Sequence, residues 1–233
     1  MNELLSCEAL TKCYQKDKTA LENVDLHIGF GRIVGLLGPN GSGKTTLIKL
    51  ANGLLVPTMG QIWINGRAPG KESHAMVSYL PERTSLPLWM TVKQLQDFYE
   101  DFYADFQRQR SSEMLDRLEI SPKQRMKQMS KGTREKVQLI LAMSRQAKLY
   151  LLDEPIGGVD PAARDYILDT IIRNYNPEAS VIISTHLIAD VEKVLDEVIF
   201  IDRGQILFQS TVDAIREEKG MSVDALFREV YKC

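Results

Sequence analysis

The feature that most constrains the fold is a glycine-rich octapeptide between an apolar segment and a segment with helical spacing. It fits the pattern G-x-x-x-x-G-K-[ST] at every position and reads Gly38-Pro39-Asn40-Gly41-Ser42-Gly43-Lys44-Thr45. Residues 32–37 before it read as a short apolar strand, and residues 46–51 after it have helical spacing. A strand, a glycine turn and a helix start form the context that this motif requires, which predicts an α/β fold.

The residue types in this loop suit a phosphate group. Glycine has no Cβ, so the backbone can curl closely around phosphate oxygens, and the N–H groups and the positive helix end face the anion. We expect Lys44 to reach the β- and γ-phosphates and Thr45 to offer its hydroxyl to Mg²⁺. A glycine-rich turn that binds nothing is disfavoured, because all three fixed positions are filled in the right context.

Length and composition are those of an ordinary globular chain. The 233 residues can bury a sizeable core, and 44% are hydrophobic. A net charge of −2 gives no basic field for nucleic acid, so we expect no nucleic-acid partner. No apolar run approaches the roughly 18 residues that cross a bilayer, and the N-terminus lacks a signal-peptide pattern. With three cysteines outside metal-ligand spacing, we expect a soluble, cytoplasmic protein with free thiols.

Strand-like and helical segments alternate over most of the chain. The strand candidates are residues 4–10, 21–28, 32–37, 61–66, 77–80, 149–152, 181–184, 198–201 and 205–208. Asp202-Arg203-Gly204 predicts a hairpin between the last two strands. Helices are expected over 161–174 and about 187–195, and two short helices finish the chain.

Residues 84–145 differ, because strand-like runs vanish and helical spacing takes over. Candidate helices run from Thr91 to Phe106, from Ser111 to Leu118 and from near Ser130 onward. We expect a helical insertion of about 84–145 within a single domain spanning 1–233. A tail of about 211–233 is either a packing element or a regulatory contact.

Two acids directly follow the apolar strand 149–152. A carboxylate at the carboxyl end of a buried parallel strand shares a crevice with the phosphate loop. There Asp153 can hold Mg²⁺ through water, and Glu154 can accept a proton from an attacking water. The structural alternative is a helix start, since acids and a following proline favour first turns.

Two further residues have both a structural and a functional interpretation. His186 follows the strand 181–184 and either points at a γ-phosphate or caps the next helix. Ser130 either only caps the helix that follows it or begins a second anion-binding helix N-terminus.

Together these motifs resemble the ATP-binding cassette (ABC) transporter ATPases, in the family's order over about residues 4–210. Residues 38–46 look like its Walker A, 149–154 like its Walker B, 129–133 like its signature and 157–160 like its D-loop. Single motifs vary in specificity, but this ordered set is hard to obtain by chance.

The resemblance implies a site for ATP and Mg²⁺. The implied catalytic residues are Glu154 as the base, His186 as the switch histidine, and Lys44. The implied nucleotide-binding residues are Tyr14, which would stack on adenine, and Gly38, Pro39, Asn40, Gly41, Ser42, Gly43, Lys44, Thr45, Thr46, Ser130, Gly132 and Asp160. The implied Mg²⁺ ligands are Thr45, Asp153 and Glu82, which lies at the family's Q-loop.

The resemblance also implies a fold and partners. The fold is an α/β P-loop NTPase (RecA-like) core with an antiparallel β subdomain and an inserted helical subdomain. Two cassettes, identical or different, would pair head to tail, with Ser130 and Gly132 of one covering the γ-phosphate held by the other. A separate transmembrane permease would then be required, and it would hold the chain at the cytoplasmic face of a membrane.

The sequence departs from the family pattern in two motifs. The signature usually reads Leu-Ser-Gly-Gly-Gln, but here Lys131 replaces a glycine and Thr133 replaces the glutamine. These changes affect rate and dimer strength rather than ATP binding. Glu82 replaces a glutamine and adds a negative charge beside the phosphates. The segment 79–82 and this signature are similar to those of ABC-2-type exporters, including the Ytr-like group of bacteria.

Two other function classes fit less well. Soluble ABC ATPases that act on ribosomes or DNA typically carry two cassettes or long coiled coils, whereas this chain has one cassette and no sustained heptads. A nucleotide kinase or GTPase would share only the phosphate loop. We therefore expect a transport ATPase, with export favoured and the cargo selected by the permease.

Overall fold

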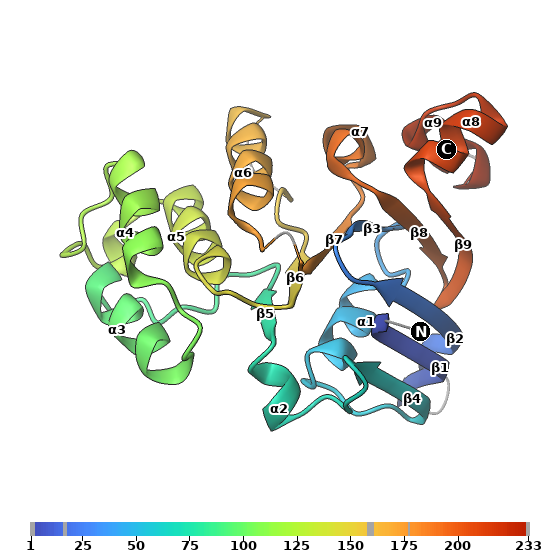
Figure 1. Ribbon diagram of the computed structural model, residues 1–233, viewed down its shortest axis with the longest axis horizontal. Helices are drawn as coiled ribbons and strands as arrows, with labels where there is room; N and C mark the ends of the chain where they lie inside the picture. The colour runs from blue at the N-terminus through green and yellow to red at the C-terminus, as the bar shows by residue number, and fades with distance from the viewer. Residues whose placement is uncertain (1–2, 16–17, 158–160, 177, 232–233) are drawn as a thin grey trace.

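The computed structural model describes residues 3–15, 18–157, 161–176 and 178–231 (Figure 1). Its strands are β1 Glu3–Gln15, β2 Lys18–Gly29, β3 Ile33–Leu37, β4 Met59–Ile64, β5 Val77–Leu80, β6 Leu149–Asp153, β7 Ser180–Thr185, β8 Glu197–Asp202 and β9 Gln205–Thr211. Its helices are α1 Lys44–Ala51, α2 Lys71–His74, α3 Val92–Phe102, α4 Arg108–Arg117, α5 Lys131–Met143, α6 Pro161–Asn174, α7 Ile188–Val191, α8 Val212–Lys219 and α9 Val223–Tyr231, with 3₁₀ turns at Met126–Gln128 and Glu192–Val194.

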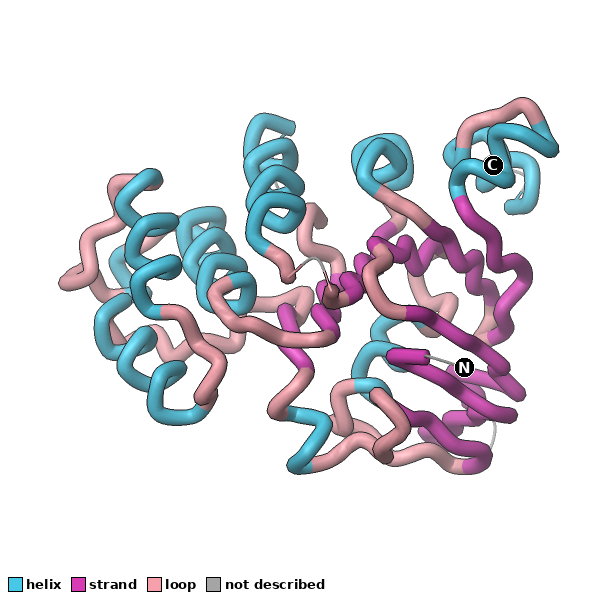
Figure 2. Tube along the Cα trace, viewed as in Figure 1, coloured by secondary structure: helices cyan, strands magenta, loops and turns pink. Residues whose placement is uncertain are grey.

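Two sheets organise the chain. The larger sheet has six strands in the order β5-β6-β7-β3-β8-β9, and all neighbours run parallel except the β8–β9 hairpin. The smaller sheet is antiparallel, in the order β2-β1-β4. In Figures 1 and 2 the helices α3, α4 and α5 lie at one end of the molecule, away from the antiparallel sheet. The predicted fold class, a P-loop NTPase core with a β subdomain and a helical insertion, is confirmed.

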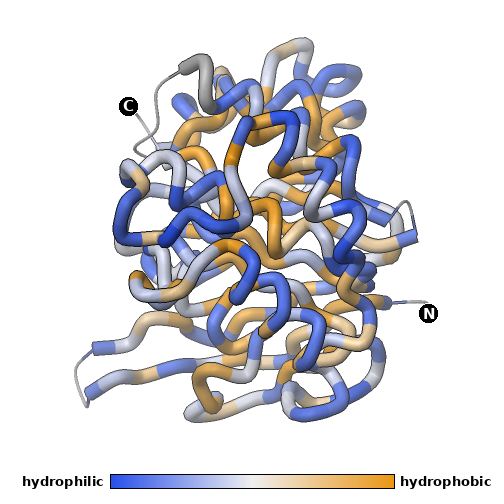
Figure 3. The backbone as a smooth tube through the Cα atoms, turned by 90° about the vertical axis from the view of Figure 1, so that its left-hand side faces the viewer, coloured by the Kyte–Doolittle hydropathy of each residue, from blue (hydrophilic) through white to orange (hydrophobic). Residues whose placement is uncertain are grey.

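Side-chain alternation along the parallel strands divides the interior into two hydrophobic clusters. On β6, Leu149 and Leu151 join the cluster that contains α1 and the antiparallel sheet, whereas Tyr150 and Leu152 join the cluster beneath α5 and α6. Because both faces are covered, these strands are apolar throughout, as expected for a buried parallel sheet. Figure 3 shows hydrophobic segments through the middle of the molecule.

The helical part begins at a well-formed cap. Thr91 Oγ1 accepts the N–H of Gln94, and the Gln94 side chain accepts the N–H of Thr91, which is a capping box. Ser130 caps α5 in a similar way, since its hydroxyl accepts the N–H of Thr133 at 3.1 Å. Ser130 therefore caps this helix, and the cap does not decide between the two interpretations, because the same helix N-terminus can also face an anion.

Arg145 ties the helical part to the parallel sheet. Its guanidinium is buried, pairs with the two Asp105 oxygens at 2.9 and 3.1 Å, and donates to the carbonyl groups of Ala75 and Val77. It also lies 3.9 Å from the centre of the Tyr103 ring. Arginine suits this place because its planar fork satisfies several acceptors at once.

Element boundaries differ from the sequence predictions in a few places. The helix expected over Thr91–Phe106 ends at Phe102, and Phe106 turns back into the core. β1 and β2 run well beyond 4–10 and 21–28, because bulges keep them paired past Ala9, whose φ is 46°. The short helix α2 has no counterpart in the prediction. The predicted hairpin at 202–204 is confirmed, with Arg203 and Gly204 at positive φ.

Candidate functional site

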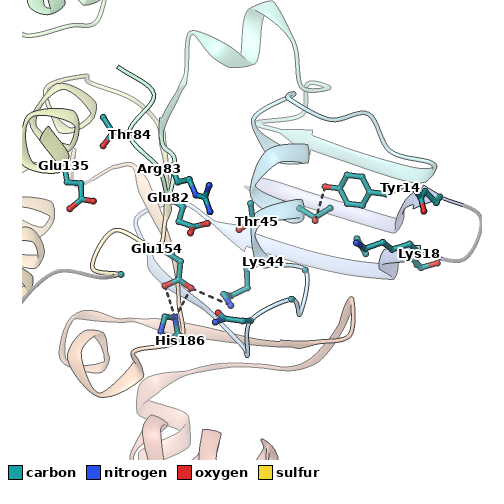
Figure 4. Close-up of a pocket in the computed structure, with 18 of the residues that line it drawn as sticks. Tyr14, Lys18, Lys44, Thr45, Glu82, Arg83, Thr84, Glu135, Glu154 and His186 are labelled. Atoms are coloured by element: carbon teal, nitrogen blue, oxygen red, sulfur yellow. Dashed lines mark hydrogen bonds and ion pairs between the residues drawn. The ribbon is translucent and has the colours of Figure 1, made fainter. Parts of the chain in front are cut away.

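A cleft of about 1370 Å³ opens between the phosphate loop, the tips of β1 and β2 and the start of α5. Figure 4 shows the side chains that point into it, and the sequence predictions account for about half of them. Its lining residues are Tyr14, Gln15, Lys18, Thr19, Ala20, Asn40, Gly41, Gly43, Lys44, Thr45, Thr46, Glu82, Arg83, Thr84, Lys131, Arg134, Glu135, Glu154, Gly157 and His186.

The loop of residues 38–43 needs its glycines for steric reasons. Gly43 has a φ of 114°, and a Cβ there would lie 2.7 Å from the carbonyl oxygen of Ala20. A Cβ on Gly38 would lie 2.2 Å from the carbonyl oxygen of Ile201. The β8–β9 turn supports the loop from behind, since Gly204 N–H donates to the carbonyl of Ser42 at 2.8 Å. The loop is therefore fixed in shape by its own surroundings.

Lys44 begins α1 and turns its side chain back over the loop. Its Nζ donates to the carbonyl oxygens of Gly38 at 2.7 Å and Pro39 at 3.1 Å, and it lies 3.7 Å from Glu154 Oε1. Burial lowers the pKa of Lys44, and the nearby charges of Glu154 and Asp153 oppose that effect. The Lys44 ammonium therefore lies among three oxygen atoms, where it would contact an oxygen of a phosphate bound at the loop.

Asp153 ends β6 directly beneath the loop and is buried. Its Oδ1 accepts the hydroxyls of Thr45 at 3.1 Å and Ser184 at 2.7 Å, whereas its Oδ2 is buried without a hydrogen-bond partner. Burial raises the pKa of the Asp153 carboxyl, while the two hydroxyls lower it. A buried carboxylate oxygen without a donor, beside the hydroxyl of Thr45, fits a hard cation such as Mg²⁺.

The part of the chain that the structure describes holds no cluster of three or more His, Cys, Asp or Glu side chains suited to a metal. Mg²⁺ is commonly held in proteins by one or two carboxylates together with substrate phosphates. The pair Thr45 and Asp153 therefore fits a magnesium ion that arrives with a nucleotide.

Glu154 occupies a left-handed turn rather than a helix start. Its φ is 49°, and its N–H donates to the carbonyl oxygen of Ser184 at 3.0 Å and lies 3.1 Å from the Ser184 hydroxyl. The helix-start interpretation is therefore wrong, because residues 154–157 form a turn, with Gly157 N–H bonded to the Glu154 carbonyl at 3.0 Å. This turn directs the Glu154 carboxylate into the cleft (Figure 4).

His186 faces the same carboxylate. Its Nδ1 lies 3.1 and 3.2 Å from the two oxygens of Glu154, and its ring is partly exposed in the cleft. The N-cap of α7 is Leu187, which has no side-chain capping bond, and the Thr185 hydroxyl accepts the N–H of Leu187 at 3.0 Å. His186 is therefore placed at the site and not at the cap.

Tyr14 and Glu82 lie at two edges of the cleft. The Tyr14 ring is 48% exposed, and its hydroxyl lies 3.3 Å from Thr46 Oγ1. Glu82 follows β5, beside Arg83 and Thr84 (Figure 4). Burial and the charges of Asp153 and Glu82 raise the pKa of Tyr79 to about 12.

The remaining predicted residues do not line this cleft. Ser130 and Gly132 lie at the start of α5, where a Cβ on Gly132 would meet nothing within 4 Å. Ser42 is buried behind the loop. Asp160 lies outside the described residues, so the predicted D-loop contact is not placed.

Sequence reasoning missed several residues at the site. Ser184 joins Asp153 to Glu154, and Arg134 and Glu135 line the helical side of the cleft. A polar residue at the end of the apolar strand β7, beside β6, was a usable signal for Ser184.

The comparisons with known proteins agree with this geometry. A family model described as ABC transporter matches residues 21–157. The chain is 30% identical over 228 residues to the Bacillus subtilis "Uncharacterized ABC transporter ATP-binding protein YxlF", covering 96% of this chain and 76% of that one. It is 28% identical to the "Daunorubicin resistance ATP-binding protein DrrA3" of Streptomyces coeruleorubidus, over 91% of this chain and 70% of that one. A solved "ATP binding subunit of ABC transporter" superposes with a TM-score of 0.87, at 30% identity, over 98% of this chain and 99% of that one.

The fold and the cleft define a P-loop nucleotide-binding protein. The chain belongs to the ABC transporter family, among its ATP-binding proteins. Within the described residues, no helix is both apolar enough and long enough to span a membrane.

Proposed function

We propose that the chain is the ATP-hydrolysing subunit of an ABC transporter and that it drives a separate membrane permease. The observation that carries this proposal is that the phosphate loop and the Glu154–His186 pair line one cleft, with the buried Asp153 bonded to Thr45 of that loop. One domain over 1–233 would perform this function, with the helical subdomain at about 84–145 and the tail at about 211–233.

ATP binding would use the two ends of the cleft. Tyr14 offers an exposed aromatic face to adenine. The N–H groups of residues 38–46 and the positive end of α1 would bind the phosphates, with Lys44 at the β- and γ-phosphates. Thr45 and Asp153, with Glu82 nearby, would hold Mg²⁺, which neutralises charge on the phosphates when bound.

Hydrolysis would use Glu154 as the general base. Glu154 accepts a proton from a water, the water oxygen bonds to the γ-phosphorus, and the bond from that phosphorus to the bridging oxygen of ADP breaks. The products are ADP and phosphate. His186 would steady the γ-phosphate, and its contact with Glu154 would orient that carboxylate.

A second cassette would complete each site. Ser130 and Gly132 lie at the start of α5 and outside the chain's own cleft, which is the placement expected if they act on a nucleotide held by the partner. The open space around Gly132 supports close approach of that nucleotide. Asp160 would couple the two sites.

The permease would dock on the helical part and would hold the chain at the cytoplasmic face of a membrane. Leu88 and Trp89 are apolar, and they are exposed between β5 and α3. We infer export, because the similar protein DrrA3 is named for daunorubicin resistance.

The experiment that tests this function is Glu154→Gln. The change removes the base but keeps the size of the side chain, so ATP should bind without being hydrolysed. We expect light scattering to show a shift from monomer to dimer when MgATP is added, with hydrolysis lost. Glu218→Gln, at an exposed position on α8, is the matched control and should hydrolyse ATP like the parent.

Two results would contradict parts of this proposal. Hydrolysis at the parent rate by Glu154→Gln would show that Glu154 is not the base. A persistent monomer that binds MgATP would contradict self-pairing and would indicate a different partner cassette or a required permease.

A further inference from the structure

A buried glutamine on α5 forms hydrogen bonds to the loop that carries Glu82. Gln138 is 4% exposed; its Oε1 accepts the N–H of Ser85 at 3.2 Å, and its Nε2 donates to the carbonyl oxygen of Pro81 at 3.4 Å. The two contacts lie on either side of Glu82. The Gln138 side chain therefore contacts the backbone on both sides of Glu82, which lines the cleft.

Apart from the packing of Leu86 against the core, backbone hydrogen bonds do little to hold this loop. Among the described residues, no backbone–backbone hydrogen bond joins 81–86 to another segment outside the regular strands. A buried amide needs its partners, because a buried donor or acceptor without one is destabilising. Gln138 and the loop therefore fix each other.

Charge gives the reason for such an anchor. Glu82 points toward a region that already contains Asp153 and Glu154, and its charge contributes to the raised pKa of Asp153. Like charges repel, so an unanchored loop would move the exposed Glu82 carboxylate away from Asp153 and Glu154. Lys44, which Glu82 also influences, lies among backbone carbonyls and 3.7 Å from Glu154.

The anchor also joins the loop to the helix that Ser130 caps. Lys131, Glu135 and Gln138 are spaced as i, i+4 and i+7 on α5, which places them on one face. Lys131 and Glu135 line the main cleft. Gln138 lines a smaller cavity of about 20 Å³, together with Glu82 and Glu154.

We propose that Gln138 is a positioning residue that holds the Glu82 carboxylate at the metal end of the cleft and ties its loop to α5. This proposal rests on the proposed function, in which Glu82 contributes to the Mg²⁺ site. A movement of the loop would then move the start of α5 with it, since a helix of this length transmits displacement as a rigid element.

The first test measures the loop itself, without nucleotide. Gln138→Met keeps an unbranched side chain but removes both hydrogen bonds, and hydrogen exchange should show faster exchange in the peptide that contains the Ser85 amide. Gln96→Met is the matched control, because Gln96 is an equally buried glutamine on α3 that bonds to the hydroxyls of Ser111 and Ser112. It should leave the exchange of Ser85 unchanged. Unchanged exchange in Gln138→Met would overturn the proposal.

The second test measures the metal dependence of nucleotide binding. We expect Gln138→Met and Glu82→Gln each to change the Mg²⁺ concentration for half-maximal ATP binding, in the same direction and by about threefold to tenfold. The double variant should change no more than either single variant, because both act through one carboxylate. Effects that multiply would mean that Gln138 acts elsewhere and would overturn the proposal.

The two tests distinguish the proposal that Gln138 holds the loop from the proposal that Glu82 binds Mg²⁺. If Glu82→Gln leaves the Mg²⁺ dependence unchanged, the metal role of Glu82 is wrong, while the exchange of Ser85 still decides whether Gln138 holds the loop. If Gln138→Met does not fold, Gln138→Asn keeps the amide on a side chain shorter by one methylene. It should show the same faster exchange at Ser85, and normal exchange there would count against the anchor.

Discussion

At the scale of single residues, the site contains buried charged groups that lower the stability of the fold and suit the proposed chemistry. Asp153 is a carboxylate enclosed by β6, β7 and the phosphate loop, with one oxygen lacking a donor. A buried charge without full compensation opposes folding, and it is retained where function needs it. Lys44 is also buried, and burial disfavours its positive charge in the same way.

We predict that Asp153→Asn makes the nucleotide-free protein less sensitive to pH. The folded-state pKa of Asp153 lies above its unfolded value, so the folded parent binds more protons between the two, and its stability rises as pH falls through the folded value. Asparagine does not titrate, so the variant lacks this pH-dependent contribution to stability. Its stability relative to the parent should therefore fall between neutral pH and the ordinary aspartate pKa of about 3.9. Urea unfolding across that range measures the difference, with exposed Asp101→Asn as the control.

We predict that Lys44→Ala weakens ATP binding about tenfold or more, because a charge-assisted contact to phosphate is worth about 1.5–3 kcal/mol. Calorimetric titration with ATP measures the affinity. Lys49→Ala, on the same helix but outside the cleft, should bind like the parent. An unchanged affinity in Lys44→Ala would contradict the role given to the loop.

At the scale of elements, one side chain links the helical part to the sheet. Arg145 follows α5 and contacts the carbonyls of Ala75, just before β5, and of Val77, the first residue of β5. Its partner Asp105 lies between α3 and α4. The packing of three segments thus depends on a single guanidinium.

We predict that Arg145→Met destabilises the protein by about 3 kcal/mol, because it leaves Asp105 and the buried carbonyl of Val77 without their donor. Urea denaturation measures the loss. Arg173→Met is the matched control, since its pair with Asp169 is exposed and contributes well under 1 kcal/mol. Equal losses in the two variants would show that the Arg145 contacts are not special.

Elements also show what local sequence can and cannot predict. The start of α3 was predictable because Thr91 and Gln94 cap it through neighbouring atoms. Its end was not, because Phe106 follows the helical spacing but is buried beyond the last turn. The loop at 38–45 carries its geometry in its own glycines. Ser184, by contrast, contacts residues 30 positions away or more, which no local pattern encodes.

At the scale of the whole molecule, the cleft joins parts that are far apart in the chain. Its walls come from the β1–β2 tips, the loop before α1, the segment after β5 and the start of α5. A ligand that contacts these walls together would stabilise their arrangement. The gain in the free energy of unfolding increases with the ratio of free ligand concentration to dissociation constant.

We predict that MgATP at 100 times its dissociation constant stabilises the parent by about 2.7 kcal/mol. For a chain of this size, the melting temperature should rise by roughly 5–10 °C, at about 2–4 °C per kcal/mol. Differential scanning measures the shift. Lys44→Ala, with an affinity about tenfold lower, should show about half of this shift or less at the same MgATP concentration. A full shift in that variant would contradict binding at the phosphate loop.

The 3.7 Å contact between Lys44 and Glu154 has a consequence for nucleotide binding. In the empty cleft, one ammonium neutralises the very carboxylate that would activate water. An arriving phosphate would compete with Glu154 for that ammonium, so the proposed base would lose its contact with Lys44 as the nucleotide binds. Nucleotide binding and release of this carboxylate would then be a single exchange of partners at Lys44.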